Sequence, residues 1–169
     1  MEILTHEQVR SALQRISGSR CVQAWTGHGN SLFAGFGQTL ITAKVTGFRG
    51  TPSHIKPPFE LQTNLADWAL TDISGSRFTS DFASVSEIIS PCMIGRTVSH
   101  LDVNAVTLEL TVVLDSIVTI SIMPYSDKSH KGRYAWLYAE PENNVTLALI
   151  GGRFRRSRSD EPLYPQRGK

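Results

Sequence analysis

The chain has 169 residues, of which 40% are hydrophobic and 19% are charged, and its formal net charge is +2 at pH 7. This composition is too apolar and too weakly charged for an intrinsically disordered protein. The 13 glycines and 8 prolines follow no period, which excludes collagen-like and low-complexity architectures. The length suits one domain, or two small fused halves, with a sizeable core.

The charge is unevenly distributed along the chain. Residues 151–169 carry six basic and two acidic side chains, a net +4, which leaves residues 1–150 with a net −2. Residues 153–169 also contain Pro162 and Pro165 and few apolar side chains, a composition typical of a flexible tail. The basic charge therefore belongs to this predicted tail, and the body of the protein is mildly acidic.

The first residues and the cysteines indicate a compartment. Residues 1–7 lack the basic and apolar regions of a signal peptide, and no apolar stretch approaches the ~18 residues needed to cross a bilayer. Cys21 and Cys92 lie far apart and form no CxxC motif, which is typical of free thiols in a reducing environment. We expect a cytoplasmic protein without a membrane partner.

Residues 5–17 have the clearest helical pattern of the chain. Thr5 and Gln8 have the spacing of a capping box, in which each side chain bonds a backbone N–H that the first turn leaves unpaired. Gly18 follows as a typical C-terminal stop. The apolar residues fall on one stripe, at Val9, Ala12, Leu13 and Ile16. We expect this helix to pack against the rest of the molecule.

Most of the remaining chain is rich in β-branched and aromatic residues and predicts strands, separated by Gly- and Pro-containing turns and a loop over 46–58. A second short helix is expected over 80–89, with Ser84 and Glu87 as a capping pair and Pro91 as its end. The fold class predicted is α+β, mainly antiparallel sheet with two short helices. The expected strands span 20–26, 31–45, 59–63, 66–72, 77–79, 97–103, 106–114, 117–123, 134–139 and 145–150.

The order of a helix followed by strands occurs twice, which suggests two β-meander halves, 1–79 and 80–152, packed as one globular unit before the tail 153–169. Trp68 and Trp136 each follow a strand pair, and a turn comes seven residues after each of them. Duplication explains this spacing, and so does the ordinary recurrence of β-meander patterning.

No convincing catalytic set emerges. A thiol nucleophile needs a base and a carboxylate that orients it, and Cys92, His100 and Asp102 are the candidates. Cys92 lies in a loop-like segment with no activating helix N-terminus after it, so a buried thiol near a surface His–Asp pair is the preferred interpretation. The histidines lack metal-ligand spacing, and the glycines at 27–29 fit a hairpin turn. We predict no enzyme, no metal and no cofactor.

Two segments are candidates for partner binding. Period-two alternation places Tyr134, Trp136 and Tyr138 on one face of a strand, where they would form a stacking platform for bases or a patch for a protein partner. The interpretation we prefer places Trp136 in the core with the two tyrosines at its margins. Four arginines follow within six residues, a pattern that can bind phosphates or an acidic protein surface but is more often a solvated tail. They are Arg153, Arg155, Arg156 and Arg158.

A third of the chain carries a resemblance to a known class of proteins: Gly95-Arg96-Thr97-Val98, Leu108-Glu109-Leu110, Thr119-Ile120-Ser121-Ile122 and Trp136. In these segments the chain is similar to small cytoplasmic bacterial proteins of uncharacterised or toxin-immunity type. That resemblance implies a non-catalytic protein that neutralises a toxin by binding it, so the expected partner is a protein, such as a toxin domain. The alternative is a nucleic-acid-associated protein that uses the basic C-terminal segment.

Overall fold

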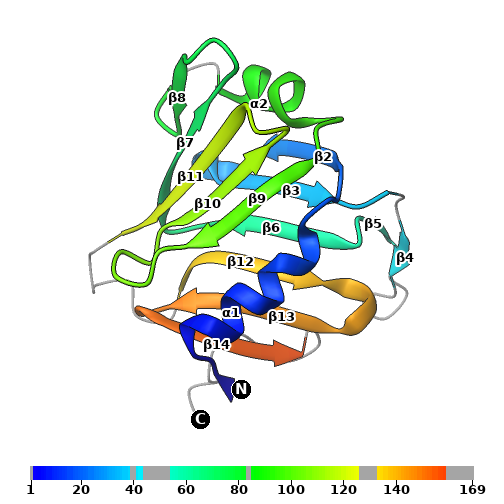
Figure 1. The fold of residues 1–169 in the computed structure, drawn as a ribbon, viewed down its shortest axis with the longest axis vertical. Helices are drawn as coiled ribbons and strands as arrows, with labels where there is room; N and C mark the ends of the chain where they lie inside the picture. The colour runs from blue at the N-terminus through cyan, green and yellow to red at the C-terminus, as the bar shows by residue number, and fades with distance from the viewer. Residues whose placement is uncertain (1, 39–40, 44–53, 83–84, 126–132, 159–169) are drawn as a thin grey trace.

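The computed structural model describes residues 2–38, 41–43, 54–82, 85–125 and 133–158. Within these ranges the chain forms two α-helices, a seven-stranded sheet, a five-stranded sheet and a two-stranded ribbon (Figure 1). All strand pairs are antiparallel. The predicted fold class is therefore confirmed. No helix in these ranges has the length and apolar character needed to span a membrane.

The seven-stranded sheet contains strands from both ends of the chain. One edge is formed by β1, which pairs with only two residues of β14, and the other edge by β2. From edge to edge the order is β1 (Glu2–Ile3), β14 (Arg153–Arg158), β13 (Val145–Ile150), β12 (Tyr134–Glu140), β6 (Phe59–Thr63), β3 (Leu32–Phe36) and β2 (Cys21–Thr26).

The five-stranded sheet is built around the β10–β11 hairpin. The loop between the paired Leu114 and Val118 has three residues, and the Ile117 N–H donates to the Leu114 carbonyl at 3.0 Å. The central residues of this turn, Asp115 and Ser116, have φ angles of +50° and +60°, the positive values found in a type I′ turn. The order is β8 (Arg77–Thr79), β7 (Ala66–Thr71), β11 (Val118–Pro124), β10 (Leu110–Leu114) and β9 (Val98–Val103). The separate ribbon pairs β4 (Ile41–Ala43) with β5 (His54–Lys56).

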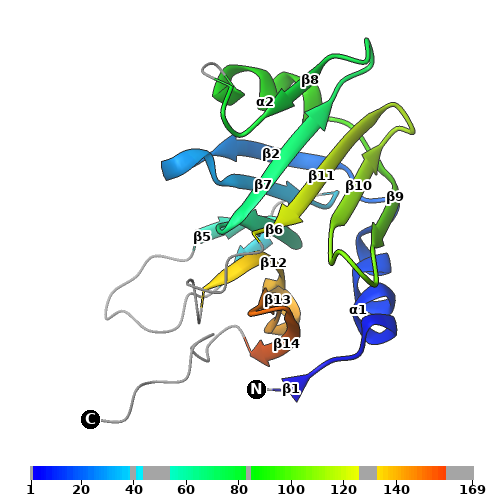
Figure 2. The ribbon, with the colours of Figure 1, turned by 90° about the vertical axis from the view of Figure 1, so that its left-hand side faces the viewer.

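Two parts of one face of the large sheet are covered by different elements. Figures 1 and 2 show the five-stranded sheet over β2, β3 and β6, whereas helix α1 (His6–Leu13) lies over β12, β13 and β14. Helix α2 (Val85–Met93) packs against β2. A continuous apolar core joins the two sheets and both helices.

Helix α1 begins as the sequence predicts. The Thr5 hydroxyl accepts from the Gln8 backbone N–H, and the Gln8 side chain accepts from the Thr5 N–H, which completes the capping box. A short 3₁₀ turn, η1 (Gln14–Ile16), continues the helix, and Gly18 follows with φ +79°. The apolar stripe is buried, with Val9, Leu13 and Ile16 fully enclosed.

Side chains of α1 also bond the edge of β9. His6 Nε2 lies 2.6 Å from the Val103 carbonyl oxygen, and the Gln14 amide donates to the Leu101 carbonyl at 3.0 Å. Arg10 forms an ion pair with Asp102 at 2.7 Å. An open strand edge invites pairing with another chain, so these contacts both place the helix and occupy the edge.

Several boundaries differ from the prediction. The expected strand 31–45 ends at Phe36, because Gly37 has φ +153° and a Cβ there would lie 2.4 Å from the Pro58 ring. The expected strand 106–114 begins only at Leu110, because the Asn104 side chain accepts from two backbone N–H groups and holds a turn.

The second helix is shifted along the chain. It runs over Val85–Met93 and contains Pro91, which was predicted to end it. Proline removes one helical hydrogen bond, but Ile89 and Met93 on either side of it are fully buried, and this packing outweighs the loss. The predicted capping residue Ser84 lies outside the described residues.

The predicted halves 1–79 and 80–152 interleave. β12, β13 and β14 complete the sheet of β2, β3 and β6, while β7 pairs with β11 of the second-half hairpin and β8 pairs with β7. Trp68 lies in the small sheet and Trp136 in the large one. A relationship between the halves remains a prediction. The flexible tail predicted over 153–169 is wrong for its first six residues, because they form β14; residues 159–169 lie outside the described residues.

Candidate binding site

The predicted aromatic platform on β12 is largely core. Trp136 and Tyr138 have no exposed surface, so neither can stack on a ligand or a partner. Trp136 packs on Phe154 with ring centroids 5.9 Å apart, and Tyr138 stacks on Phe59 at 6.1 Å. The core role predicted for Trp136 is confirmed, and Tyr138, which was predicted at the margin of the core, is fully buried as well, so these two residues form no stacking platform.

Tyr134 does not share their surroundings. The pairing of β12 with β13 changes register between Tyr134 and Leu137, which marks a β-bulge. A bulge breaks the period-two alternation, and Tyr134, which is half-buried, places its hydroxyl 3.5 Å from the Gln62 side chain. The bulge cannot be recognised in the sequence, so period-two alternation predicted all three aromatics on one face of the strand.

A buried charged network lies at the end of β12. The Glu140 carboxylate accepts from the Tyr138 hydroxyl at 2.8 Å and the Asn143 amide at 2.7 Å, and it pairs with Arg15 at 2.7 Å. The Glu140 side chain is 2% exposed, whereas that of Arg15 is 54% exposed. Burial and the neighbouring carboxylate raise the pKa of Tyr138 far above its usual value, so the hydroxyl stays protonated and donates.

The four arginines of β14 are divided between the two faces of the sheet. Their strand register alternates, so Arg156 and Arg158 share the face of the buried Phe154, and Arg153 and Arg155 lie on the opposite face. A single continuous basic track along the strand is therefore absent from 153–158. The prediction of one arginine cluster is corrected to two pairs.

Arg156 and Arg158 line an open cleft of about 490 Å³ at the end of β14. The rest of the lining comes mainly from the turn between β12 and β13, which contains η4 (Pro141–Asn143). We call this hollow the arginine cleft; its polar lining is Glu2, Asn143, Asn144, Arg156, Ser157 and Arg158.

Cys92, His100 and Asp102 are not assembled as a catalytic triad. Cys92 lies in α2, whereas His100 and Asp102 lie on β9. Asp102 pairs with Arg10, so the carboxylate that would orient the histidine is held by the helix. His100 is exposed.

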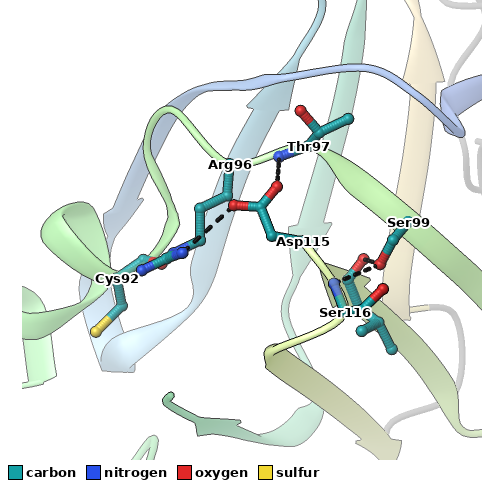
Figure 3. A network of polar contacts seen from close by, with 7 residues as sticks. Cys92, Arg96, Thr97, Ser99, Asp115 and Ser116 are labelled. Atoms are coloured by element: carbon teal, nitrogen blue, oxygen red, sulfur yellow. Dashed lines mark hydrogen bonds and ion pairs between the residues drawn. The ribbon is translucent and has the colours of Figure 1, made fainter.

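The surroundings of Cys92 also oppose nucleophilic reactivity. Its pKa is raised, chiefly by burial and further by the negative charge of Asp72, although Arg96 acts in the opposite sense. Figure 3 shows that Arg96 turns toward Asp115 and the Cys92 backbone carbonyl, at 3.3 Å and 2.7 Å. Asp115 also accepts from the Thr97 N–H at 2.9 Å. These contacts tie α2 to the β10–β11 turn and are structural.

No metal centre is visible in the part of the chain that the structure describes. Among those residues, His, Cys, Asp and Glu side chains never gather in groups of three or more that could hold a metal ion.

An aromatic pair that was not predicted from the sequence lies on the face of the large sheet opposite to α1, with Trp25 exposed and Phe33 half-buried. Trp25 of β2 stacks on Phe33 of β3 with ring centroids 5.4 Å apart and planes 3° apart. Trp25 is 47% exposed. A shallow hollow around the pair is also lined by polar side chains of β2 and β6, and we call this surface the Trp25 face: Gln23, Trp25, Phe33, Glu60 and Gln62.

A signal for the Trp25 face exists in the sequence but is ambiguous. Gln23 and Trp25 alternate with Ala24, and Phe33 alternates with Leu32, Ala34 and Phe36, so both faces of this strand pair carry large apolar side chains. Aromatic residues ordinarily indicate the core, and here Phe36 faces inward whereas Trp25 is exposed. Only the position of the second sheet decides between the two faces.

Comparisons with protein-family models, curated proteins and solved structures find no match to this chain.

Proposed function

We propose that the chain is a non-catalytic protein-binding protein and that its partner contacts the Trp25 face. The observation that carries this proposal is the 47% exposure of Trp25 while it is stacked on Phe33. Stacking fixes the indole before binding, so little side-chain freedom is lost when a partner covers it. Tryptophan is among the residues most enriched at the energetic centres of protein interfaces.

The surroundings of Trp25 have the composition of an interface. Gln23 and Gln62 provide amide donors and acceptors around the aromatic pair, as in the polar rim of a protein contact. Glu60 is the charged side chain among the described residues that line the hollow. An arginine of the partner could lie over the indole and approach the Glu60 carboxylate, which combines a cation–π contact with an ion pair.

Charge complementarity supports a basic partner surface. Residues 1–150 carry a net −2, and the six basic side chains of residues 151–169 account for the positive sign of the whole chain. A protein surface that presents arginine is therefore the occupant we propose for the Trp25 face. Neutralisation of a bacterial toxin is the biological role that the sequence resemblance suggests for such binding.

Site-specific photo-crosslinking in the host cell tests this proposal. A benzophenone amino acid at position 25 should crosslink one protein, whereas the same group at Val106, which is 90% exposed on another surface, should not. With the purified partner, Trp25→Ala should weaken the affinity by at least about 30-fold, the loss typical of an interface centre. Val106→Ala is the matched control and should leave the affinity unchanged.

Two results would overturn the proposal. One is the absence of any protein crosslinked from position 25 in cells that contain the chain at normal levels. The other is an identified partner whose affinity is the same for the wild type and Trp25→Ala. For the toxin role, the wild-type chain and not Trp25→Ala should restore growth of cells that express the crosslinked partner.

The alternative function, association with nucleic acid, predicts a different response. Affinity for single-stranded DNA would then fall steeply with salt concentration, because bound phosphates release counterions. It would also depend on arginines of both faces of β14. A flat salt dependence would exclude this alternative and leave the protein-binding proposal untouched.

A further inference from the structure

We propose that the arginine cleft is a binding site for a phosphate group. This inference concerns the face of the large sheet opposite to the Trp25 face and does not depend on a protein partner there. The cleft volume of about 490 Å³ lies within the range of small-molecule sites, about 300–1,000 Å³.

The two guanidinium groups are placed to act together. Arg156 and Arg158 are two residues apart on β14, so their side chains leave the same face about 6.6 Å apart. Both are exposed. The only acid among the described lining residues is Glu2, which pairs in register with Arg156, so the lining keeps an excess of positive charge.

The turn that contributes Asn143 is held in place by the buried network of β12. The Asn143 amide donates to Glu140, which is itself fixed by Arg15 and the Tyr138 hydroxyl. An amide nitrogen has two N–H bonds, and this contact uses one of them. Asn143 is therefore oriented by a buried carboxylate, as a preorganised binding residue should be.

The arrangement of donors favours phosphate over carboxylate. The lining combines donors of two kinds: the guanidinium groups of β14, and the side-chain amides of the asparagines in the neighbouring turn, which lies beside the end of β14 (Figure 1). The acceptor oxygens of a carboxylate lie in one plane, whereas a tetrahedral phosphate presents oxygens on several sides. Arginine also binds phosphate in a bidentate manner.

Titration calorimetry of the full chain at low ionic strength tests the site with three probes: inorganic phosphate, adenosine monophosphate and acetate. We expect saturable binding of a phosphate probe and much weaker binding of acetate. Arg156→Gln and Arg158→Gln should each reduce the phosphate affinity by about tenfold or more, as loss of one charge-assisted contact does. Arg153→Gln removes the same charge from the opposite face and should change the affinity less than twofold.

The probes also distinguish the source of the phosphate. Equal affinity for the two phosphate probes indicates recognition of the phosphate alone, and tighter binding of adenosine monophosphate indicates that the cleft also holds a nucleoside. The proposal is overturned if neither probe binds saturably. It is also overturned if Arg153→Gln weakens binding as much as Arg158→Gln, because the effect then reflects general charge on the strand, as expected for a nucleic-acid polyanion.

Discussion

The inner face of the seven-stranded sheet consists of two regions that differ in their cover. Over β2, β3 and β6 the cover is a second sheet, and the enclosed side chains include the fully buried Leu32, Phe36 and Leu61. Over β12, β13 and β14 the cover is the single helix α1, and the enclosed side chains include the carboxylate of Glu140. The first region is the sandwich region and the second is the helix region.

The difference has a geometric origin. A helix with its side chains is about 10 Å wide, whereas three strands spaced about 4.8 Å apart occupy more than that. One helix therefore leaves the margins of the helix region close to water, and a second sheet leaves fewer such margins. Arg15 can neutralise Glu140 there while half its side chain remains solvated, and the arginine cleft opens at the same margin.

Truncation of a tryptophan in the sheet that covers the sandwich region should have the largest effect. Trp68 is 2% exposed, and its indole N–H donates to the Asn30 carbonyl at 2.7 Å. Trp68→Ala should lower the free energy of unfolding by about 3–5 kcal/mol, because it leaves a cavity and an unpaired carbonyl. Urea denaturation measures this. Trp25→Ala makes the same chemical change at an exposed position, and an equal loss in both variants would contradict the assignment of their surroundings.

Alkaline pH should destabilise the protein through the same region. Burial raises the pKa of Cys21 from 9.0 to about 12, against a smaller opposing effect of a backbone hydrogen bond with Gln23. As the pH rises above 9, the unfolded chain loses this proton first, so the unfolded state gains stability. The Cys21 contribution, about 4 kcal/mol from the three-unit difference, is complete below pH 9 and is lost by about pH 12.

Replacement of Cys21 separates this effect from other alkaline titrations. The free energy of unfolding of Cys21→Ala should fall less between pH 9 and pH 12 than that of the wild type. Cys92→Ala is the control and should retain most of the wild-type dependence, because Cys92 is only partly buried. Parallel pH curves for the wild type and Cys21→Ala would show that this thiol titrates normally in the folded state.

In the helix region, Glu140→Gln should have a smaller effect. The amide keeps an acceptor for Tyr138 but turns a donor toward Asn143 and removes the charge that pairs with Arg15. Because Arg15 can return to water, we expect a loss of about 1–3 kcal/mol, less than for a fully buried pair. Glu142→Gln, an exposed neighbour, should change stability by less than about 0.5 kcal/mol in the same denaturation experiment.

Much of the fold follows from local sequence. Three strands, β6, β8 and β13, have the predicted limits, and the capping box of Thr5 and Gln8 starts α1 where expected. These elements depend on short-range patterns, such as side-chain alternation and cap chemistry. Gly37 and Pro91 show the limit of such patterns. The end of β3 at Gly37 depends on its close approach to Pro58, and the continuation of α2 through Pro91 depends on packing of the helix against the core.

The candidate surfaces were less predictable than the fold. The arginines of β14 were identified, but their division between two faces depends on pairing with β13. The asparagine wall of the arginine cleft and the Trp25 face were not anticipated, because neither has a motif. Both depend on which face of a strand meets another layer.

The sequence by itself determined the class of the fold, the first helix with its cap, most strands and the separation of an acidic body from a basic end. Tertiary structure decided which aromatics are covered: Trp136 is fully buried against Phe154 and Trp25 faces solvent, although both occupy strands of the same sheet. Residues 153–158, which were predicted as the start of a flexible tail, form β14 because they pair with β13. This pairing is a contact that local composition does not encode.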